Sequence, residues 1–132
     1  MMTVFEIEQT LIELFVQKKK QTRFIERLGS SKQRPKIWAD LRDTRYLDPH
    51  CLTAIANSDK QCVEIVKRLE SIGMSQKVYL MSSDEDIDGK SMALKEIIST
   101  IWQIEEVIGF CQSSKLGFFK NHEDEFYILQ RK

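Results

Sequence analysis

An Asp-x-Asp-x-Asp-Gly motif at residues 84–89 is the pattern in this chain most suggestive of chemistry. Three carboxylates at alternate positions before a glycine open the calcium loop of an EF-hand, where they converge on one cation. The match then fails, because Lys95 stands at the twelfth position, where the loop requires a bidentate glutamate. A calcium site outside an EF-hand would need Glu96 or a distant acid to complete its ligands. We therefore predict no metal site and interpret the motif as an acidic loop in which Asp88 caps the following helix.

Two acidic turns form the predicted partner-binding surface. Residues 84–88 and 123–125 each flank an expected strand, so we expect both groups of carboxylates on one rim of a sheet. Clustered acids steer a basic partner toward them and fix its register, although charged turns also serve to prevent strand-to-strand aggregation. The predicted partner-binding residues are Asp84, Glu85, Asp86, Asp88, Glu123, Asp124 and Glu125.

A basic stretch at residues 18–45 supports an alternative prediction. It holds ten basic residues against three acidic ones, and cations beside aromatic rings are what single-stranded nucleic acids require. Phe24 and Trp38 lie among aliphatic residues, however, and are expected in the core. We otherwise interpret the stretch as a solvated basic face, or as one that meets an acidic partner. The residues of the alternative nucleic-acid site are Lys18, Lys19, Lys20, Arg23, Arg27, Arg34 and Lys36.

No residues with the types and spacing of a catalytic or cofactor site stand out. The cysteines Cys51, Cys62 and Cys111 have no CxxC spacing, and the last two lie in apolar-periodic segments where a free cysteine is a core residue. His50 and His122 have no partner at metal-ligand spacing. The sequence also lacks the nucleotide-binding, serine-hydrolase and zinc-protease motifs. We therefore predict that the chain is not an enzyme and takes no cofactor.

The elements that would position these residues begin with a helix over residues 3–28. Apolar residues recur there at three- and four-residue spacing, and Thr3 with Glu6 has the spacing of a capping box. A polar break at residues 17–22 can split this segment into two helices. Gly29 is expected to end it.

The middle of the chain predicts shorter elements. Residues 29–36 are expected to form an exposed loop, and residues 37–46 fit either a short helix or a strand. Pro49 suits the first position of a helix over residues 49–56. A further helix is expected over residues 59–72, capped by Ser58 or Asp59, with Val63 among its buried residues.

The second half of the chain predicts most of the sheet. Residues 77–81 are apolar and β-prone, residues 82–90 are an acidic loop, and residues 90–104 have a broad apolar helical face that includes Met92. Three short aromatic segments then predict an antiparallel meander at residues 106–112, 115–120 and 125–131. The expected fold class is α+β: N-terminal helices packed on a small, mainly antiparallel sheet of about four strands, with a C-terminal three-stranded meander.

The 132 residues carry 20 basic and 20 acidic side chains and are 42% hydrophobic. This predicts a single globular domain over residues 1–132, with 29–46 as an exposed basic loop or irregular segment. The chain has neither an apolar run of about 20 residues nor a signal-peptide pattern, so we expect a cytoplasmic protein with no membrane partner. We expect a protein-binding inhibitor of the immunity or antitoxin type, which neutralises a toxin, for instance a basic nuclease, by covering its surface. The main alternative is a nucleic-acid-binding accessory protein that uses residues 18–45. A third hypothesis is a subunit or adaptor whose amphipathic first helix docks on a partner.

Overall fold

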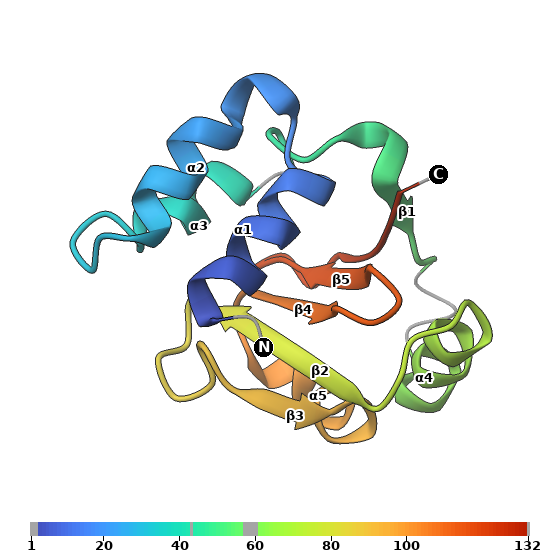
Figure 1. The fold of residues 1–132 in the computed structure, drawn as a ribbon. Coiled ribbons are helices and arrows are strands. Elements are labelled where there is room, and N and C mark those ends of the chain that lie inside the picture. Colours follow the sequence, from blue (N-terminus) through green and yellow to red (C-terminus); the bar gives the residue numbers. More distant parts are fainter. Residues whose placement is uncertain (1–2, 43, 57–60, 132) are drawn as a thin grey trace.

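A six-stranded antiparallel sheet organises the protein. The computed structural model describes residues 3–42, 44–56 and 61–131, and its strands follow the order β1-β6-β5-β4-β2-β3 (Figure 1). The predicted α+β class is confirmed: helices precede a C-terminal strand meander in one antiparallel sheet. The sheet has six strands rather than about four, because two three-residue edge strands add to it.

The N-terminal helical segment is broken in two, as its polar middle indicated. Helix α1 spans Val4–Phe15, and its capping box is present, since Thr3 Oγ1 accepts from the backbone N–H of Glu6 at 3.2 Å. A 3-10 turn, η1, covers Lys18–Lys20, and helix α2 covers Gln21–Leu28 with Gly29 as its C-cap.

The segment that follows α2 differs from the prediction in one element. Residues 31–35 form consecutive turns, and helix α3 spans Lys36–Leu41. The predicted helix over residues 49–56 is wrong: a 3-10 turn, η2, covers Pro49–Cys51 and strand β1 covers Leu52–Ala54. Strand β1 forms because it pairs with Tyr127–Leu129 at the sheet edge, and such tertiary pairing overrides weak local propensity.

Helix α4 spans Cys62–Ser71; the caps expected at Ser58 or Asp59 lie outside the described residues. Val63 was expected in the core but is 62% exposed, because the buried face of α4 is formed by Ile65, Val66 and Leu69. Strand β2 spans Lys77–Ser82, slightly longer than predicted.

The segment predicted as a helix over residues 90–104 starts instead as a strand. Strand β3 spans Ser91–Ala93 and pairs with β2, so Met92 belongs to the sheet edge. Helix α5 follows at Leu94–Thr100, and the 3-10 turn η4 at Ile101–Gln103.

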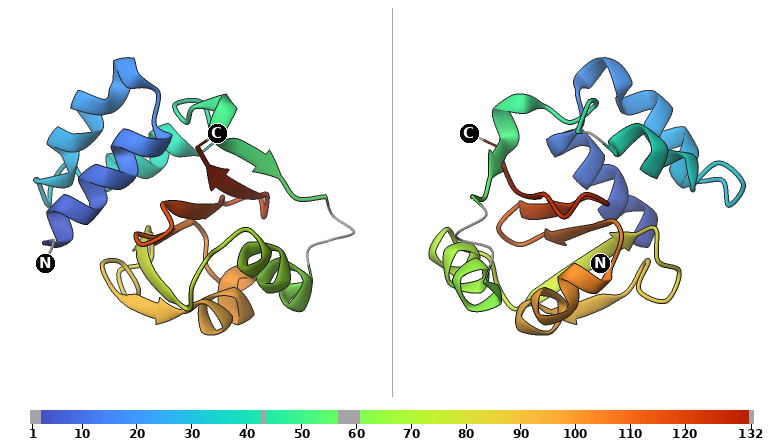
Figure 2. Two further views of the ribbon diagram at one scale, coloured as in Figure 1. Left: turned by 45° about the vertical axis from the view of Figure 1, so that its right-hand side comes forward. Right: turned by 180° about the vertical axis from the view of Figure 1, so that it is seen from behind.

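The meander is confirmed in strands β4 (Val107–Cys111), β5 (Leu116–Lys120) and β6 (Phe126–Gln130). Helices α1 to α3 cover one face of the sheet and α4 and α5 cover the other (Figure 2). Every residue of β4 and β5 is therefore buried, which explains why these strands, apart from Lys120 at the end of β5, lack polar residues at alternate positions.

Candidate functional site

The pairing of the strands brings the two predicted acidic turns to the same end of the sheet. Loop 83–90 follows β2, and turn 121–125 connects β5 to β6. The residues at that end pair in sequence across the sheet: Ser82 with Val107, Val107 with Lys120, and Lys120 with Phe126. Adjacent strands lie about 4.8 Å apart, so two to three strand spacings, about 10–15 Å, separate the loop from the turn. We call residues 83–90 and 121–125 the acidic rim.

Loop 83–90 is ordered by its own carboxylates. The Asp84 side chain accepts from the backbone N–H of Asp86 at 2.9 Å, and Asp88 accepts from the N–H of Ser82 at 2.9 Å. Asp88 therefore does not cap the following helix as predicted, because β3 intervenes and the N-cap of α5 is Ala93. Glu85 and Asp86 remain exposed.

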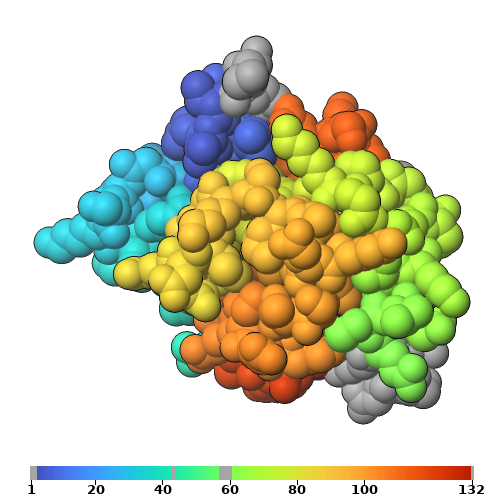
Figure 3. All heavy atoms as spheres, turned by 90° about the horizontal axis from the view of Figure 1, so that it is seen from below, coloured from blue at the N-terminus to red at the C-terminus, as the bar shows by residue number. Residues whose placement is uncertain are grey.

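Asp88 also contacts the basic stretch through Arg34. The Arg34 guanidinium donates to both Asp88 oxygens at 2.9 Å, and to the two Glu8 oxygens at 2.7 and 2.5 Å. Tyr79 donates its hydroxyl to Glu8 at 2.6 Å, and Glu8 is only 2% exposed. Figure 3 shows loop 83–90 (yellow) beside the segment that carries Arg34 (cyan). Two residues predicted for different partner surfaces thus form one internal network.

The electrostatics of this network follow from its charges. Hydrogen bonding to Glu8 raises the pKa of Arg34 above its already high ordinary value, an effect that burial opposes and Asp88 reinforces. Burial, and then the hydrogen bond to Glu8, raise the pKa of the Tyr79 hydroxyl well above its ordinary range. Arg34 is therefore charged and Tyr79 is neutral near pH 7.

The three acidic residues of turn 121–125 are exposed, although the carboxylates of Asp124 and Glu125 also have partners within the chain. The Asn121 side-chain oxygen accepts from the backbone N–H groups of Glu123 and Glu125 at 3.1 and 2.9 Å, which fixes the turn. Glu123, Asp124 and Glu125 are all exposed. Asp124 pairs with the buried ammonium of Lys120 at 2.7 Å, so this acid is partly neutralised within the chain.

Glu106 lies between the loop and the turn and is a site residue that sequence reasoning missed. Its side chain is 4% exposed, and its Oε2 atom is buried with no hydrogen-bond partner among the described residues. Burial, and then the charge of Glu105, raise its pKa, while His122, Arg42 and Lys120 act in the opposite direction. Its only sequence signal is the alternation of β4, which places Glu106 on the inward face shared with Ile108.

The basic stretch does not form one surface. Arg27 is paired with Asp40, and Arg34 belongs to the network described above. Lys18, Lys19 and Arg23 are exposed, whereas the Lys20 ammonium lies 5.2 Å from the centre of the Tyr46 ring. Lys36 is exposed in the first turn of α3. The predicted burial of Phe24 and Trp38 is confirmed.

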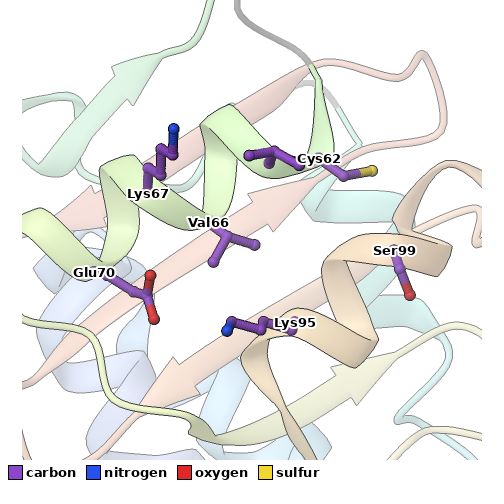
Figure 4. A pocket seen from close by; sticks show the side chains of 7 residues that line it. Cys62, Val66, Lys67, Glu70, Lys95 and Ser99 are labelled. Carbon is purple, nitrogen blue, oxygen red and sulfur yellow. The ribbon is translucent and has the colours of Figure 1, made fainter.

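Other cavities and thiols offer less chemistry. A groove of about 440 Å³ separates α4 from α5, with Val66 at its floor and Lys67, Glu70 and Lys95 around it (Figure 4). Cys62 lines this groove and donates to the carbonyl of Ile98 at 3.2 Å.

Cys111 has an unusual thiol environment. Burial opposes ionisation, but hydrogen bonds from Ser113 and Ser75 lower its pKa to about 6. The side chain is only 1% exposed, so the sulfur is shielded from solvent. Among residues 3–42, 44–56 and 61–131, no group of three His, Cys, Asp or Glu side chains is placed to hold a metal ion.

Comparison with protein-family models, with curated proteins and with solved structures finds no match to this chain. Within the described residues, no helix has the length and apolar character needed to cross a membrane. The functional argument therefore starts from the acidic rim, where charge, exposure and an unpaired buried carboxylate coincide.

Proposed function

We propose that this chain is a non-catalytic protein-binding module, an inhibitor of the immunity or antitoxin type that covers the surface of a basic toxin domain. The observation that supports this proposal is the pairing of β2, β4, β5 and β6, which puts two acidic turns at one end of the sheet. The loop and the turn lie about 10–15 Å apart. A protein interface of standard size is therefore large enough to cover both.

The rim combines exposed charge with rigid support. Glu85, Asp86, Glu123 and Glu125 are exposed. The backbone beneath them is fixed because its N–H groups donate to the side-chain oxygens of Asp84, Asp88 and Asn121. A preordered surface loses little conformational entropy on binding. Carboxylates grouped on it accelerate association with a basic partner and exclude acidic ones.

Reversing charge on the rim is expected to abolish tight binding. A variant with Glu85→Lys, Asp86→Lys and Glu123→Lys should bind its protein partner about 100-fold more weakly, because like charges would then face each other. The partner is first isolated from the native host with the tagged chain and nuclease treatment. It is then purified for calorimetric measurement of Kd and for an assay of its own activity with and without this chain.

The matched control for that experiment reverses three exposed acids elsewhere, with Glu13→Lys, Glu64→Lys and Glu96→Lys. This control changes the net charge equally and should alter Kd by about threefold or less. Equal weakening in both variants, or a partner whose activity is unaffected by the wild-type chain, contradicts the proposal.

Nucleic-acid binding stays the alternative prediction, and the exposed basic residues Lys18, Lys19, Arg23 and Lys36 favour it. It predicts that a Lys18→Gln, Lys19→Gln, Arg23→Gln variant loses affinity for a single-stranded oligonucleotide. The slope of log K against log salt should become shallower by about 2, since three phosphate contacts disappear. Fluorescence anisotropy at several salt concentrations measures this. A wild-type chain that does not bind the oligonucleotide at low salt removes the alternative.

A further inference from the structure

We infer that Glu106 is the anchor point of the acidic rim: its carboxylate receives the guanidinium of one arginine of the protein partner. This inference rests on the proposed function and names the chemical group that the rim recognises. The exposed acids of the rim would then supply long-range attraction, and Glu106 would supply the specific contact at its centre.

The position of Glu106 is the first step of the argument. Its backbone carbonyl accepts from the Ser82 hydroxyl at 2.6 Å and from the Ser83 N–H at 3.2 Å, so it adjoins loop 83–90. The following residue, Val107, pairs with Lys120, which precedes turn 121–125. Glu106 thus lies between the two acidic turns and is fixed by both sides of the rim.

The second step is that one oxygen of the carboxylate, Oε2, is buried without a hydrogen-bond partner among the described residues. A buried polar atom is nearly always hydrogen-bonded, and leaving one unpaired is costly. Neither neighbouring cation satisfies Oε2 of Glu106. Lys120 instead donates to the carbonyls of Ile104 and Glu105 and pairs with Asp124, so its ammonium is already used.

A second unpaired atom lies in the same place. Nδ1 of His122 is also buried without a hydrogen-bond partner, although the side chain as a whole is 27% exposed. His122 belongs to the surface turn 121–125 and acts electrostatically on Glu106, so the inferred guanidinium would have to displace this side chain in order to reach Glu106. Two unsatisfied buried polar atoms at the centre of a charged surface indicate a group that is supplied from outside.

The chemistry of Glu106 favours a guanidinium over an ammonium. Burial destabilises the charged form of the Glu106 carboxylate. A cation that pairs with this carboxylate must itself lose its hydrating water. Arginine is more weakly hydrated than lysine and presents a planar set of donors matched to a carboxylate. Such anchors at the centre of an interface are the residues that dominate binding energy.

The test uses the peptides triarginine amide and trilysine amide as probes, with amide chemical shifts of the full chain followed by NMR at pH 7 and low salt. We expect triarginine to shift rim residues and to bind more tightly than trilysine. Glu106→Gln should weaken triarginine binding about tenfold. The adjacent exposed Glu105→Gln removes the same charge and should weaken it by about twofold or less.

Several results would overturn the inference. Equal losses in the two variants would mean that only the total charge matters, and equal affinity for the two peptides would mean that no guanidinium is recognised. An absence of triarginine binding, or chemical-shift changes only outside the rim, would also overturn the inference. Failure of the proposed function gives a different result from failure of this inference. In that case, charge reversal at Glu85, Asp86 and Glu123 would leave the Kd for the isolated protein partner unchanged.

A stability measurement distinguishes this role from a purely structural one. Because the native pKa of Glu106 is raised, the native state binds more protons than the unfolded state between the ordinary glutamate pKa and the raised one. Wild-type stability therefore falls as pH increases through that window. Glu106→Gln should have a Tm about 2–5 °C higher than wild type at pH 7 and a similar Tm near pH 4. A lower Tm at pH 7 would show that Glu106 is structural and would overturn the inference.

Discussion

Replacing Arg34 with methionine is expected to lower the free energy of unfolding by about 3–5 kcal/mol. The substitution would leave Glu8 in the core with only the Tyr79 hydroxyl as a donor, because both guanidinium contacts to its carboxylate are lost. A buried carboxylate without a countercharge is among the costliest defects a fold can carry. Urea denaturation at pH 7 measures the change.

The matched control is Lys36→Met, which removes one exposed positive charge two residues away and should change stability by about 0.5 kcal/mol or less. The double variant Glu8→Met, Arg34→Met removes both charges and should recover much of the loss, since a hydrophobic pair can replace a buried ion pair. A loss in Arg34→Met no larger than in Lys36→Met would show that the network contributes nothing.

Replacing Gly109 with alanine is expected to destabilise the fold by about 3 kcal/mol or more. Gly109 pairs directly with Phe118 in the β4–β5 register, and a Cβ added to it would lie 2.2 Å from two carbon atoms of the Phe118 ring. That ring is fully buried and stacks on Phe126 at 5.4 Å. Because Phe118 is packed on Phe126 and shielded from solvent, either its ring or the paired backbone has to shift to accept the added methyl group.

Two further variants test this explanation of Gly109. Gly29→Ala is the control, because a Cβ added to Gly29 would be 3.9 Å from the nearest atoms. The free energy of unfolding of this variant should rise slightly or differ from that of the wild type by about 1 kcal/mol at most. Phe118→Leu should partly rescue Gly109→Ala, with a favourable coupling energy of about 1–2 kcal/mol in a double-mutant cycle. Thermal and urea unfolding are measured for the wild type, the three single variants and the double variant, and additive effects of Gly109→Ala and Phe118→Leu would contradict a direct clash.

The elements that could be predicted from sequence are those with a strong local signal. The helical period and the Thr3–Glu6 capping box predicted α1, and three aromatic segments between polar turns predicted β4, β5 and β6. Strands β1 and β3 were expected as helix because three residues carry no recognisable alternation. They form only because the edges of the sheet offer them partners.

The candidate site, like the fold, could be predicted only where the sequence carries a local signal. The two acidic turns are visible in the sequence, and their position after expected strands predicted a shared rim. Glu8, Arg34 and Asp88 could not be connected, because 26 and 54 residues separate the bonded pairs. Glu106 could not be distinguished from Glu105 either, since only the strand register determines which of the two is turned inward.

The order of strands in the sheet also determines when the protein can fold during its synthesis. Strand β1 pairs only with β6, and β2 needs β4, which is made 25 residues later. Helices α1 to α3 leave the ribosome before the strands on which they pack, because their apolar faces contact Ile108, Phe119 and Leu129. A nascent chain therefore exposes those faces until β6 has been made, and the sheet closes when the β5–β6 hairpin inserts between β1 and β4, which are made before it.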